Sequence, residues 1–597
     1  MRVRTDVAAL AKPFDYAVPD SWHDEIAVGT RVRVVLHGRR VGGWVVEDDV
    51  EPPAGIAVQP LKTWSGWGPP ASVVELVEWA AWRWAGPVSF FLGAASPAQV
   101  VRRLPASAPG PSSSGQAPSA SSSLIDLATG ALAKTETSVL RIAPTTDLLD
   151  LVTAVLDDPS VSTREGGVLV LVPSLGWAER LTERLVRRGY GATTRWDEAR
   201  AGWPVAVGTR VGAWAPLPSL AAVVVLDAHD EAYIEESSPT YSAVEVAVER
   251  ARRQGVPCLL TSPCPPAVVR HGRETLTMSA SEERAGWPAI ECVDRRGADP
   301  RLGLFSEEFV RLARSVLDEE GTRRERGPLV CVFNRTGRAR LLACVHCGEL
   351  AQCAACGAAV HQVEGGLRCP RCHEERPMVC AACGRLRMKT LRVGVSRLRE
   401  ELSALLGVEA GEVTGAVADG DLPQSPVLIG TEAVLHRVRR AAAVAFLDID
   451  LHLLAARFSA TDETLALLVR ASRLVGPRRA GPSSARVLVQ TRVPDHLVLT
   501  SAARGDLSEV LDDDATMRQV AGLPPFAALA AVSGPLAPPY LVALRGAGSD
   551  RGISVTELPD GRHLVRAADH NALCDLLAEV PRPPGRGLRI AVDPQAI

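Results

Sequence analysis

Short, continuous apolar runs recur along the middle of the chain, and helical or polar segments separate them. Four lie within residues 138–290: VLVLVP (168–173), VAVGTR (205–210), AAVVVLD (221–227) and PCLLTSP (257–263). Apolar runs of this length are typical of strands that are covered on both faces. The amphipathic stretch WAERLTERLVRRG (177–189) favours a crossover helix after the first run. This part of the chain therefore predicts a parallel sheet with helices on both faces.

The same pattern returns later, so that the sequence predicts two α/β lobes. The second set of runs is LVCVFNR (329–335), VLIGTE (427–432) and AVAFLDID (443–450). Residues 1–104 differ, because short strands and turns lead there into a Trp-rich amphipathic helix at 72–85. We expect Trp79, Trp82 and Trp84 of this helix to lie in the core rather than to stack on bases. Residues 105–123 consist mainly of Pro, Gly, Ser and Ala, which predicts a flexible linker.

Length and charge limit the function only loosely. A chain of 597 residues is long enough for about four domains. The formal net charge of −3 gives no global basic signal, so any nucleic-acid surface has to be local. The N-terminus lacks the apolar core of a signal peptide, and no run approaches the ~18 apolar residues of a membrane span. We expect a cytoplasmic protein with no membrane partner and with reduced cysteines.

Eight of the 13 cysteines gather between residues 344 and 383. They form four C-x-x-C pairs: Cys344 and Cys347, Cys353 and Cys356, Cys369 and Cys372, Cys380 and Cys383. Each such turn places two thiolates along one edge of a tetrahedron, so eight thiolates predict two Zn²⁺ ions in closed, structural sites. Disulfides are disfavoured in a reducing compartment, and iron–sulfur clusters usually have other spacings. The nearby His346, His361 and His373 are expected to be bystanders.

Several stretches around these cysteines and elsewhere resemble the PriA family of replication restart proteins, also called primosomal protein N′. They are PFDYAVP (13–19), VGTRVRVVLHGRRVGGWVV (28–46), FNRTGRARLLACVHCG (333–348), MRQVAGLPPFAALA (517–530) and IAVDP (590–594). The resemblance implies an N-terminal domain that binds the 3′ end of a nascent strand at a fork. Asp15, Gly38 and Lys62 match the pocket for the 3′-terminal nucleotide. The resemblance also implies that the first and last C-x-x-C pairs share one zinc ion and the middle two share the other.

The fold that the resemblance implies is α/β, with two RecA-like helicase lobes and an inserted two-zinc module. A small, mostly β N-terminal DNA-binding domain precedes the lobes, and an α+β C-terminal domain follows them. The expected boundaries are 1–104 for the N-terminal domain, 105–137 for a flexible linker, 138–298 for lobe one, 299–340 with 386–500 for lobe two, 341–385 for the zinc module and 501–597 for the C-terminal domain. The winged-helix domain that the family usually carries has no counterpart before lobe one.

The segments that bind ATP in a working family member are altered here. At the place of the glycine-rich phosphate loop the chain reads RIAPTTDLLDL (141–151), with Thr145 about where the lysine belongs. The family's D-E-E-H box aligns with LDAH (226–229), so Leu226 replaces the Mg²⁺-holding aspartate and Ala228 the glutamate that polarises water. We therefore expect no catalytic residue and no ATP or Mg²⁺ cofactor.

The arginine-finger box is altered as well. VGPRRAG (475–481) stands in its place, and Pro477 takes the position of the first arginine. Since an arginine finger contributes about 10³-fold or more in rate, this change also argues against hydrolysis.

Three functions remain open. The first is a replication restart protein that binds forked DNA and single-stranded DNA with a 3′ end, without ATP hydrolysis. Its zinc module would receive single-stranded-DNA-binding protein and helicase-loader or other primosome proteins, and the basic segment RLRMKTLRVGVSRLR (385–399) would contact phosphates. The second is an active ATP-dependent 3′→5′ DNA helicase. The third is a zinc-binding scaffold that does not recognise forks.

Overall fold

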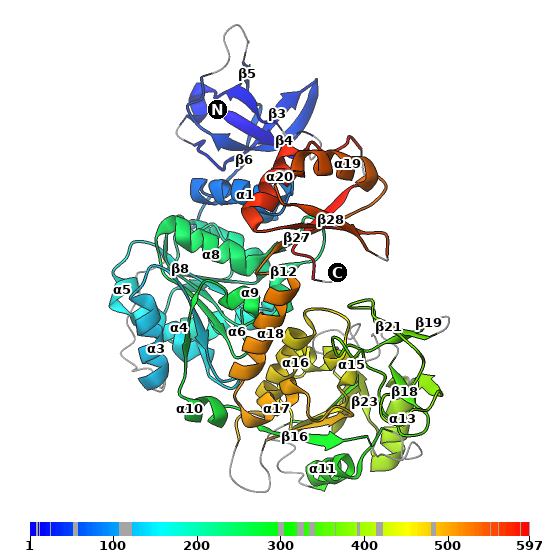
Figure 1. Cartoon of the computed structure of the whole chain (residues 1–597). Helices are drawn as coiled ribbons and strands as arrows, with labels where there is room; N and C mark the ends of the chain where they lie inside the picture. The colour runs from blue at the N-terminus through cyan, green and yellow to red at the C-terminus, as the bar shows by residue number, and fades with distance from the viewer. Residues whose placement is uncertain are drawn as a thin grey trace.

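The structure is a computed structural model of the 597-residue chain (Figure 1). It describes all residues except 8–9, 11, 24, 52–57, 107–121, 297–303, 319–326, 334–340, 364–365, 391–394, 414–421, 479–484, 550, 559, 586 and 596–597. The described residues form an N-terminal β sheet, two parallel α/β lobes, small sheets around the cysteines and a C-terminal antiparallel sheet. Within these residues, no helix combines the length and the apolar character that crossing a membrane requires.

The N-terminal sheet has six strands in the order β5-β2-β1-β4-β3-β6. They are β1 (Arg2–Thr5), β2 (Phe14–Ala17), β3 (Arg31–Leu36), β4 (Arg39–Glu47), β5 (Gln59–Pro60) and β6 (Thr63–Gly66), with a short 3₁₀ turn η1 (Asp20–Trp22). Val32 and Val34 of β3 are buried, as the two-residue period of a strand with one covered face requires. Helices α1 (Ala71–Arg83) and α2 (Val88–Ala95) follow the sheet.

The tryptophans of this region are structural. Trp84 is 2% exposed, and its ring lies 5.3 Å from that of Trp79 and 6.0 Å from that of Tyr241 in lobe one. Trp82 donates a hydrogen bond of 2.9 Å to Asp575 of the C-terminal domain. Trp84 therefore lies in the core as expected, whereas Trp79 and Trp82 are half-buried.

Lobe one is built on a parallel sheet of seven strands in the order β15-β7-β14-β11-β8-β10-β9. The strands are β7 (Thr137–Arg141), β8 (Gly167–Leu171), β9 (Ala192–Thr193), β10 (Val205–Gly208), β11 (Leu220–Val225), β14 (Cys258–Ser262) and β15 (Glu274–Thr277). The helices and turns are α3 (Ser122–Leu132), α4 (Leu148–Asp157), α5 (Pro159–Ser162), α6 (Leu175–Arg187), α7 (Trp196–Arg200), η2 (Arg210–Trp214), η3 (Glu231–Tyr233), α8 (Ala243–Gln254), α9 (Ala267–Arg270) and α10 (Ala280–Ala285), and a hairpin joins β12 (Ile234–Glu235) to β13 (Tyr241–Ser242). The sheet confirms the expected strands at 168–173, 205–210, 221–227 and 257–263.

The expected flexible linker at 105–137 is wrong in its second half. Helix α3 occupies residues 122–132, and Leu124, Ala128 and Leu132 are buried against lobe one. These apolar residues recur every four positions, which is the period of a helix with one buried face. Most of the Pro- and Ser-rich part of the predicted linker lies outside the described residues.

Lobe two repeats the architecture with six parallel strands in the order β16-β26-β25-β17-β24-β23. They are β16 (Ala289–Asp294), β17 (Leu329–Phe333), β23 (Gly411–Val413), β24 (Val427–Gly430), β25 (Ala443–Asp448) and β26 (Arg486–Thr491). Its helices are α11 (Glu307–Asp318), α13 (Val395–Leu406), α14 (Ala433–Arg437), α15 (Asp450–Leu453), α16 (Ala460–Val475) and α17 (Leu497–Arg504). Because β16 pairs with β26 along its whole length, lobe two begins earlier than the predicted residue 299.

The cysteine region lies between β17 and α13, in two small sheets of β18 (Leu342–Cys344) with β22 (Met388–Thr390) and of β19 (His361–Val363), β20 (Gly366–Arg368) and β21 (Glu375–Arg376). The predicted boundary at residue 385 is wrong, since β22 pairs with β18 and closes the module beyond that point. Arg371 fixes the module to lobe two by donating to the carbonyls of Ala455 at 2.5 Å and Arg457 at 3.1 Å.

The C-terminal domain is an antiparallel sheet in the order β28-β29-β27-β30 with helices beside it. Its elements are α18 (Ser508–Ala521), β27 (Ala528–Ser533), α19 (Ala537–Gly548), β28 (Ser554–Glu557), β29 (His563–Ala567), α20 (His570–Glu579) and β30 (Arg589–Val592). The predicted boundary after residue 500 falls inside α17, which packs on β16 of lobe two. Helix α18 runs past both lobes on its way to this sheet (Figure 1).

Candidate metal centres and nucleic-acid interface

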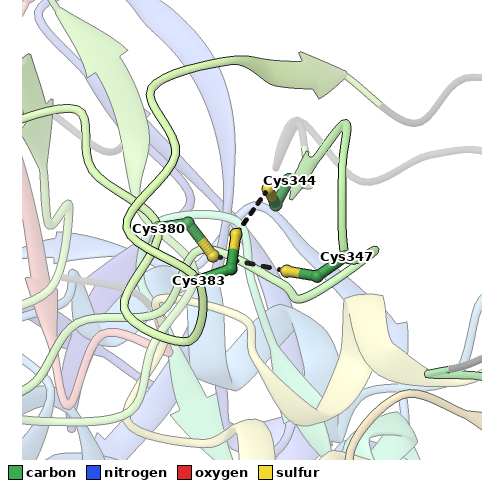
Figure 2. A group of neighbouring side chains, drawn as sticks. All are labelled: Cys344, Cys347, Cys380 and Cys383. Atoms are coloured by element: carbon green, nitrogen blue, oxygen red, sulfur yellow. Dashed lines mark hydrogen bonds between the residues drawn. The ribbon is translucent and has the colours of Figure 1, made fainter.

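The first cysteine cluster joins the two ends of the inserted module (Figure 2). Cys344 ends β18, and Cys347, Cys380 and Cys383 lie in the turns around it. The sulfur of Cys344 lies 3.6 Å from that of Cys383, and the sulfur of Cys347 lies 3.5 Å from that of Cys380. All four sulfurs lie within 4.8 Å of one another.

The second cluster consists of the two middle pairs. Sulfur–sulfur distances are 3.4 Å between Cys353 and Cys372 and 3.5 Å between Cys356 and Cys369. The first and last C-x-x-C pairs, each called a knuckle below, thus form one cluster, and the two middle knuckles form the other. This is the arrangement that the family resemblance implied.

Both clusters fit a tetrahedral four-thiolate zinc site. Zn–S bonds of ~2.3 Å give sulfur–sulfur edges of ~3.8 Å, close to the separations found here. The glycines that follow three of the knuckles, Gly348, Gly357 and Gly384, have φ angles of +76°, +71° and +71°, a left-handed conformation that a side chain disfavours. Backbone N–H groups of His346 and Arg371 lie 3.4 Å from the sulfurs of Cys344 and Cys369 and stabilise negative charge there. Within the described residues, neither group includes a histidine.

The three residues predicted to receive a DNA 3′ end are spread over the N-terminal sheet. Asp15 lies in β2, and one of its carboxylate oxygens accepts a hydrogen bond of 3.0 Å from Arg2. Gly38 forms the β3–β4 turn with a φ of +78°, and nothing lies within 4 Å of the place where a Cβ would be. Lys62 is exposed beside β6, and its backbone N–H donates to Arg33. No contact joins these three side chains among the described residues, so their joint role stays a prediction.

The end of β11 carries the altered acidic box. Leu226 is fully buried, and its carbonyl accepts a hydrogen bond of 2.6 Å from the Tyr233 hydroxyl. Asp227 has a left-handed backbone with a φ of +56° and is 1% exposed, while Ala228 is 5% exposed. His229 accepts or donates a hydrogen bond at 3.0 Å with Ser262, and burial lowers the pKa of its imidazole. The strand end thus carries buried apolar side chains at Leu226 and Ala228, the two positions where the family resemblance implies carboxylates.

The turn after β7, where a phosphate loop would lie, is likewise occupied by protein groups. Thr145 donates a hydrogen bond of 2.8 Å to the carbonyl of Gly286. Asp147 caps helix α4 by accepting from the N–H of Leu149 at 3.0 Å, and Arg184 donates to the same carboxylate at 2.7 Å. A helix N-terminus is a natural anion site, and here a side-chain carboxylate already fills that role.

Two arginines of lobe two, which the sequence did not single out, contact the turn after β11. Arg473 of α16 contacts both carboxylate oxygens of Asp227, with 2.6 Å from Nη2 to Oδ1, and Arg470 forms an ion pair with Asp230. They precede Pro477, at which the finger box was expected, by one to two helical turns. The spacing of three residues in RASR is the sequence signal, because it places both guanidinium groups on one face of a helix.

Comparison with known proteins connects these features. The family model of the PriA 3′ DNA-binding domain (3′BD) matches residues 2–97. A replication restart protein PriA of Haemophilus influenzae is 26% identical over 397 residues, which are 60% of this chain and 53% of that protein. A probable replication restart protein PriA of Mycobacterium bovis is 27% identical, with 97% of this chain and 90% of that protein covered. A DEAD box protein of Methanococcus jannaschii covers 64% of this chain and 88% of its own, with 11% identity and a TM-score of 0.30.

The chain spans about half the length of the first curated relatives that it matches. The matched 3′BD comes first, two parallel α/β lobes follow, and the two four-cysteine clusters are inserted in the second lobe, in the order that the family resemblance implied. The chain is therefore similar to PriA replication restart proteins, at about 25% identity, and its residues 2–97 match the model of their 3′ DNA-binding domain.

Proposed function

We propose that this protein binds forked DNA that carries a free 3′ end, prepares the fork for replication restart and does not hydrolyse ATP. The observation that carries the proposal is the match of residues 2–97 to the 3′ DNA-binding domain. A small sheet of this kind can present a nucleotide end to short loops, and those loops hold Gly38 and Lys62. The DNA ligand also agrees with a place beside the nucleoid in the cytoplasm.

Asp15, Gly38 and Lys62 form the site in this proposal. The Asp15 carboxylate would accept the hydrogen bond of a terminal 3′-hydroxyl, while Arg2 holds it in place. The missing side chain at Gly38 leaves the β3–β4 turn open for the close approach of a sugar. Lys62 would contact a phosphate, and such contacts release counterions and make binding sensitive to salt.

The absence of hydrolysis rests on the residues at the ends of β7 and β11. Leu226 and Ala228 offer no ligand for Mg²⁺ and no base for water, and Thr145 gives its hydroxyl hydrogen to Gly286. Asp147 sits at the α4 N-terminus, where its negative charge repels a phosphate. These features favour a restart protein without a motor over an active 3′→5′ helicase.

The two zinc-loaded clusters would form a docking platform for single-stranded-DNA-binding protein and for helicase-loader proteins. Exposed apolar side chains lie directly beside the first cluster: Val345 is 43% exposed and Leu386 is 62% exposed. Arg385 and Arg387 flank Leu386 along the chain, which suits a partner segment that is both acidic and apolar. Closed zinc sites hold such turns in a fixed shape, which keeps the apolar side chains presented to a partner.

Fork binding by anisotropy tests the proposal with three DNA ends: a 3′-hydroxyl, a 3′-phosphate and no leading strand. We expect a preference of at least ~10-fold for the 3′-hydroxyl, because a site built to bond a hydroxyl rejects analogues that lack it. Asp15→Asn should remove that preference. Lys62→Ala should weaken binding and lower the salt slope by about 1, whereas Lys134→Ala, a lysine of lobe one, should change neither. Equal affinity of the unmodified protein for all three forks would refute end recognition.

A further inference from the structure

The contact between the two lobes is made by charged side chains in the place where helicase lobes would enclose a nucleotide. Arg473 donates from two nitrogens to Asp227 and from its Nε to the carbonyl of Pro144 at 2.8 Å. One guanidinium group thereby binds the turn after β7 and the turn after β11 at once. In an open α/β sheet, the carboxyl ends of the strands are where ligands bind.

The second pair lies beside the first on the same helix face. Arg470 donates to Asp230 across the lobe contact and to His436 within lobe two. Asp230 is held in turn, since its other oxygen accepts from the N–H of Ala232 at 2.9 Å. Each of the two guanidinium groups therefore has at least two hydrogen-bond partners that fix its position.

Burial distinguishes these pairs from ordinary surface ion pairs. The side chains of Asp227 and Asp230 are 2% and 5% exposed, and those of Arg473 and Arg470 are 26% and 28% exposed. The indole of Trp177 lies 5.9 Å from the Arg473 guanidinium and covers it from the lobe-one side. Salt and water screen such a contact far less than an exposed one.

We propose that the Arg473–Asp227 and Arg470–Asp230 pairs form an interlobe clamp that keeps the two lobes closed on each other without any nucleotide. The positive charge of Arg473 neutralises the Asp227 carboxylate directly. The Asp147 carboxylate at the α4 N-terminus takes the place of a phosphate. Because protein side chains already occupy both sites, nucleotide should bind neither the open nor the closed arrangement of the lobes preferentially. The equilibrium between the two arrangements should therefore not depend on nucleotide.

Helix α18 supports the same closed arrangement from the side. Arg270 of α9 donates to the Asp512 carboxylate at 3.0 Å and to the carbonyl of Leu511. The ring of His271 lies 4.9 Å from that of Phe526. The clamp is thus not the sole support of the closed arrangement, because α18 and Phe526 of the C-terminal domain also hold lobe one, and a test must separate the two. It does not depend on what residues 2–97 bind.

Amide hydrogen exchange and small-angle scattering of the full zinc-loaded protein test the clamp. In Arg470→Gln/Arg473→Gln, exchange in peptides that span residues 226–233 and 465–475 should rise at least about tenfold, and the radius of gyration should increase. Arg478→Gln, an exposed arginine five residues beyond Arg473, is the matched control and should change neither.

The isosteric variant Asp227→Asn/Asp230→Asn removes the same ion pairs from the lobe-one side without loss of side-chain volume. It therefore tests the clamp even if the arginine variant does not fold. It should show the same faster exchange. Adding Mg²⁺ and ATP to the unmodified protein should leave exchange in both peptides unchanged. Unaltered exchange and scattering in both variants, or protection by ATP in the unmodified protein, would overturn the clamp.

Discussion

The carboxyl group of Asp227 has its charge fixed by a group from the opposite lobe. Burial by itself raises the pKa of this carboxyl, but the adjacent Arg473 guanidinium outweighs it and brings the pKa below its ordinary value. The left-handed backbone of Asp227, with a φ of +56°, aims the side chain at the lobe contact, and Asp is among the residues that tolerate that conformation. Asp227 therefore acts here as one half of an ion pair between the lobes.

Asp227→Asn should lower stability by about 3 kcal/mol at neutral pH, because it leaves the Arg473 charge mostly buried without its partner. The folded pKa of Asp227 is depressed, so its contribution is fully present above an unfolded value of about 3.9 and is lost as pH falls below it. The other titratable groups near Asp227 are Arg470, His436, His229, Asp230, Tyr233 and Cys264. Urea unfolding of the unmodified protein and the variant between pH 7 and pH 3 measures the difference in their free energies of unfolding. This difference should shrink only in the acid range. A difference that is constant down to pH 3 would contradict the assignment.

The C-x-x-C turns are the elements that sequence spacing describes most completely. Each C-x-x-C turn fixes its own two sulfurs, and three of the four are followed by a glycine with a positive φ. The spacing alone leaves open which knuckles share an ion, because any two of them complete a tetrahedron. Strand pairing decides it: β18 and β22 bring the first and last knuckles together, and β19 to β21 fold over the middle two.

Zinc content per chain, measured by mass spectrometry, tests this arrangement. The unmodified protein should hold two ions, in agreement with its two four-cysteine groups. Cys344→Ser/Cys380→Ser removes two ligands of one cluster and should retain one ion, whereas Cys344→Ser/Cys369→Ser should retain none. Cys292→Ser, a half-buried thiol outside both clusters, is the control. If neighbouring knuckles along the chain shared the ions, both double variants would lose both.

Local signals predicted these elements, and contacts between distant segments account for what was missed. Continuous apolar runs predicted both parallel sheets, because a strand that is covered on both faces needs apolar side chains at nearly every position. The helix at 122–132 was missed because its short apolar pattern adjoins a Pro- and Ser-rich stretch. Arg470 and Arg473 were missed for another reason. Their role depends on the approach of residues in different lobes, such as Arg470 and Asp230, which are 240 positions apart in the chain.

Contacts between its parts brace the whole molecule as one body. Arg83 at the end of α1 donates to Asp593 at 2.6 Å, and Thr240 of lobe one donates to the carbonyl of Val592 at 2.9 Å. The N-terminal helices, lobe one and the C-terminal sheet share one apolar core. Together with α18 and the clamp, these contacts suggest a rigid frame that holds the 3′BD and the cysteine clusters in a fixed relation, rather than a machine whose lobes move past each other.

ATP turnover by the purified zinc-loaded protein, with and without forked DNA bearing a free 3′ end, is the measurement to make. Binding to the same fork is followed in parallel. We predict tight fork binding and no release of phosphate above a protein-free blank, with or without DNA. Turnover that the fork stimulates would contradict a restart protein without a motor. Its loss in Asp230→Asn or Glu231→Gln would then identify the acid that carries out the chemistry.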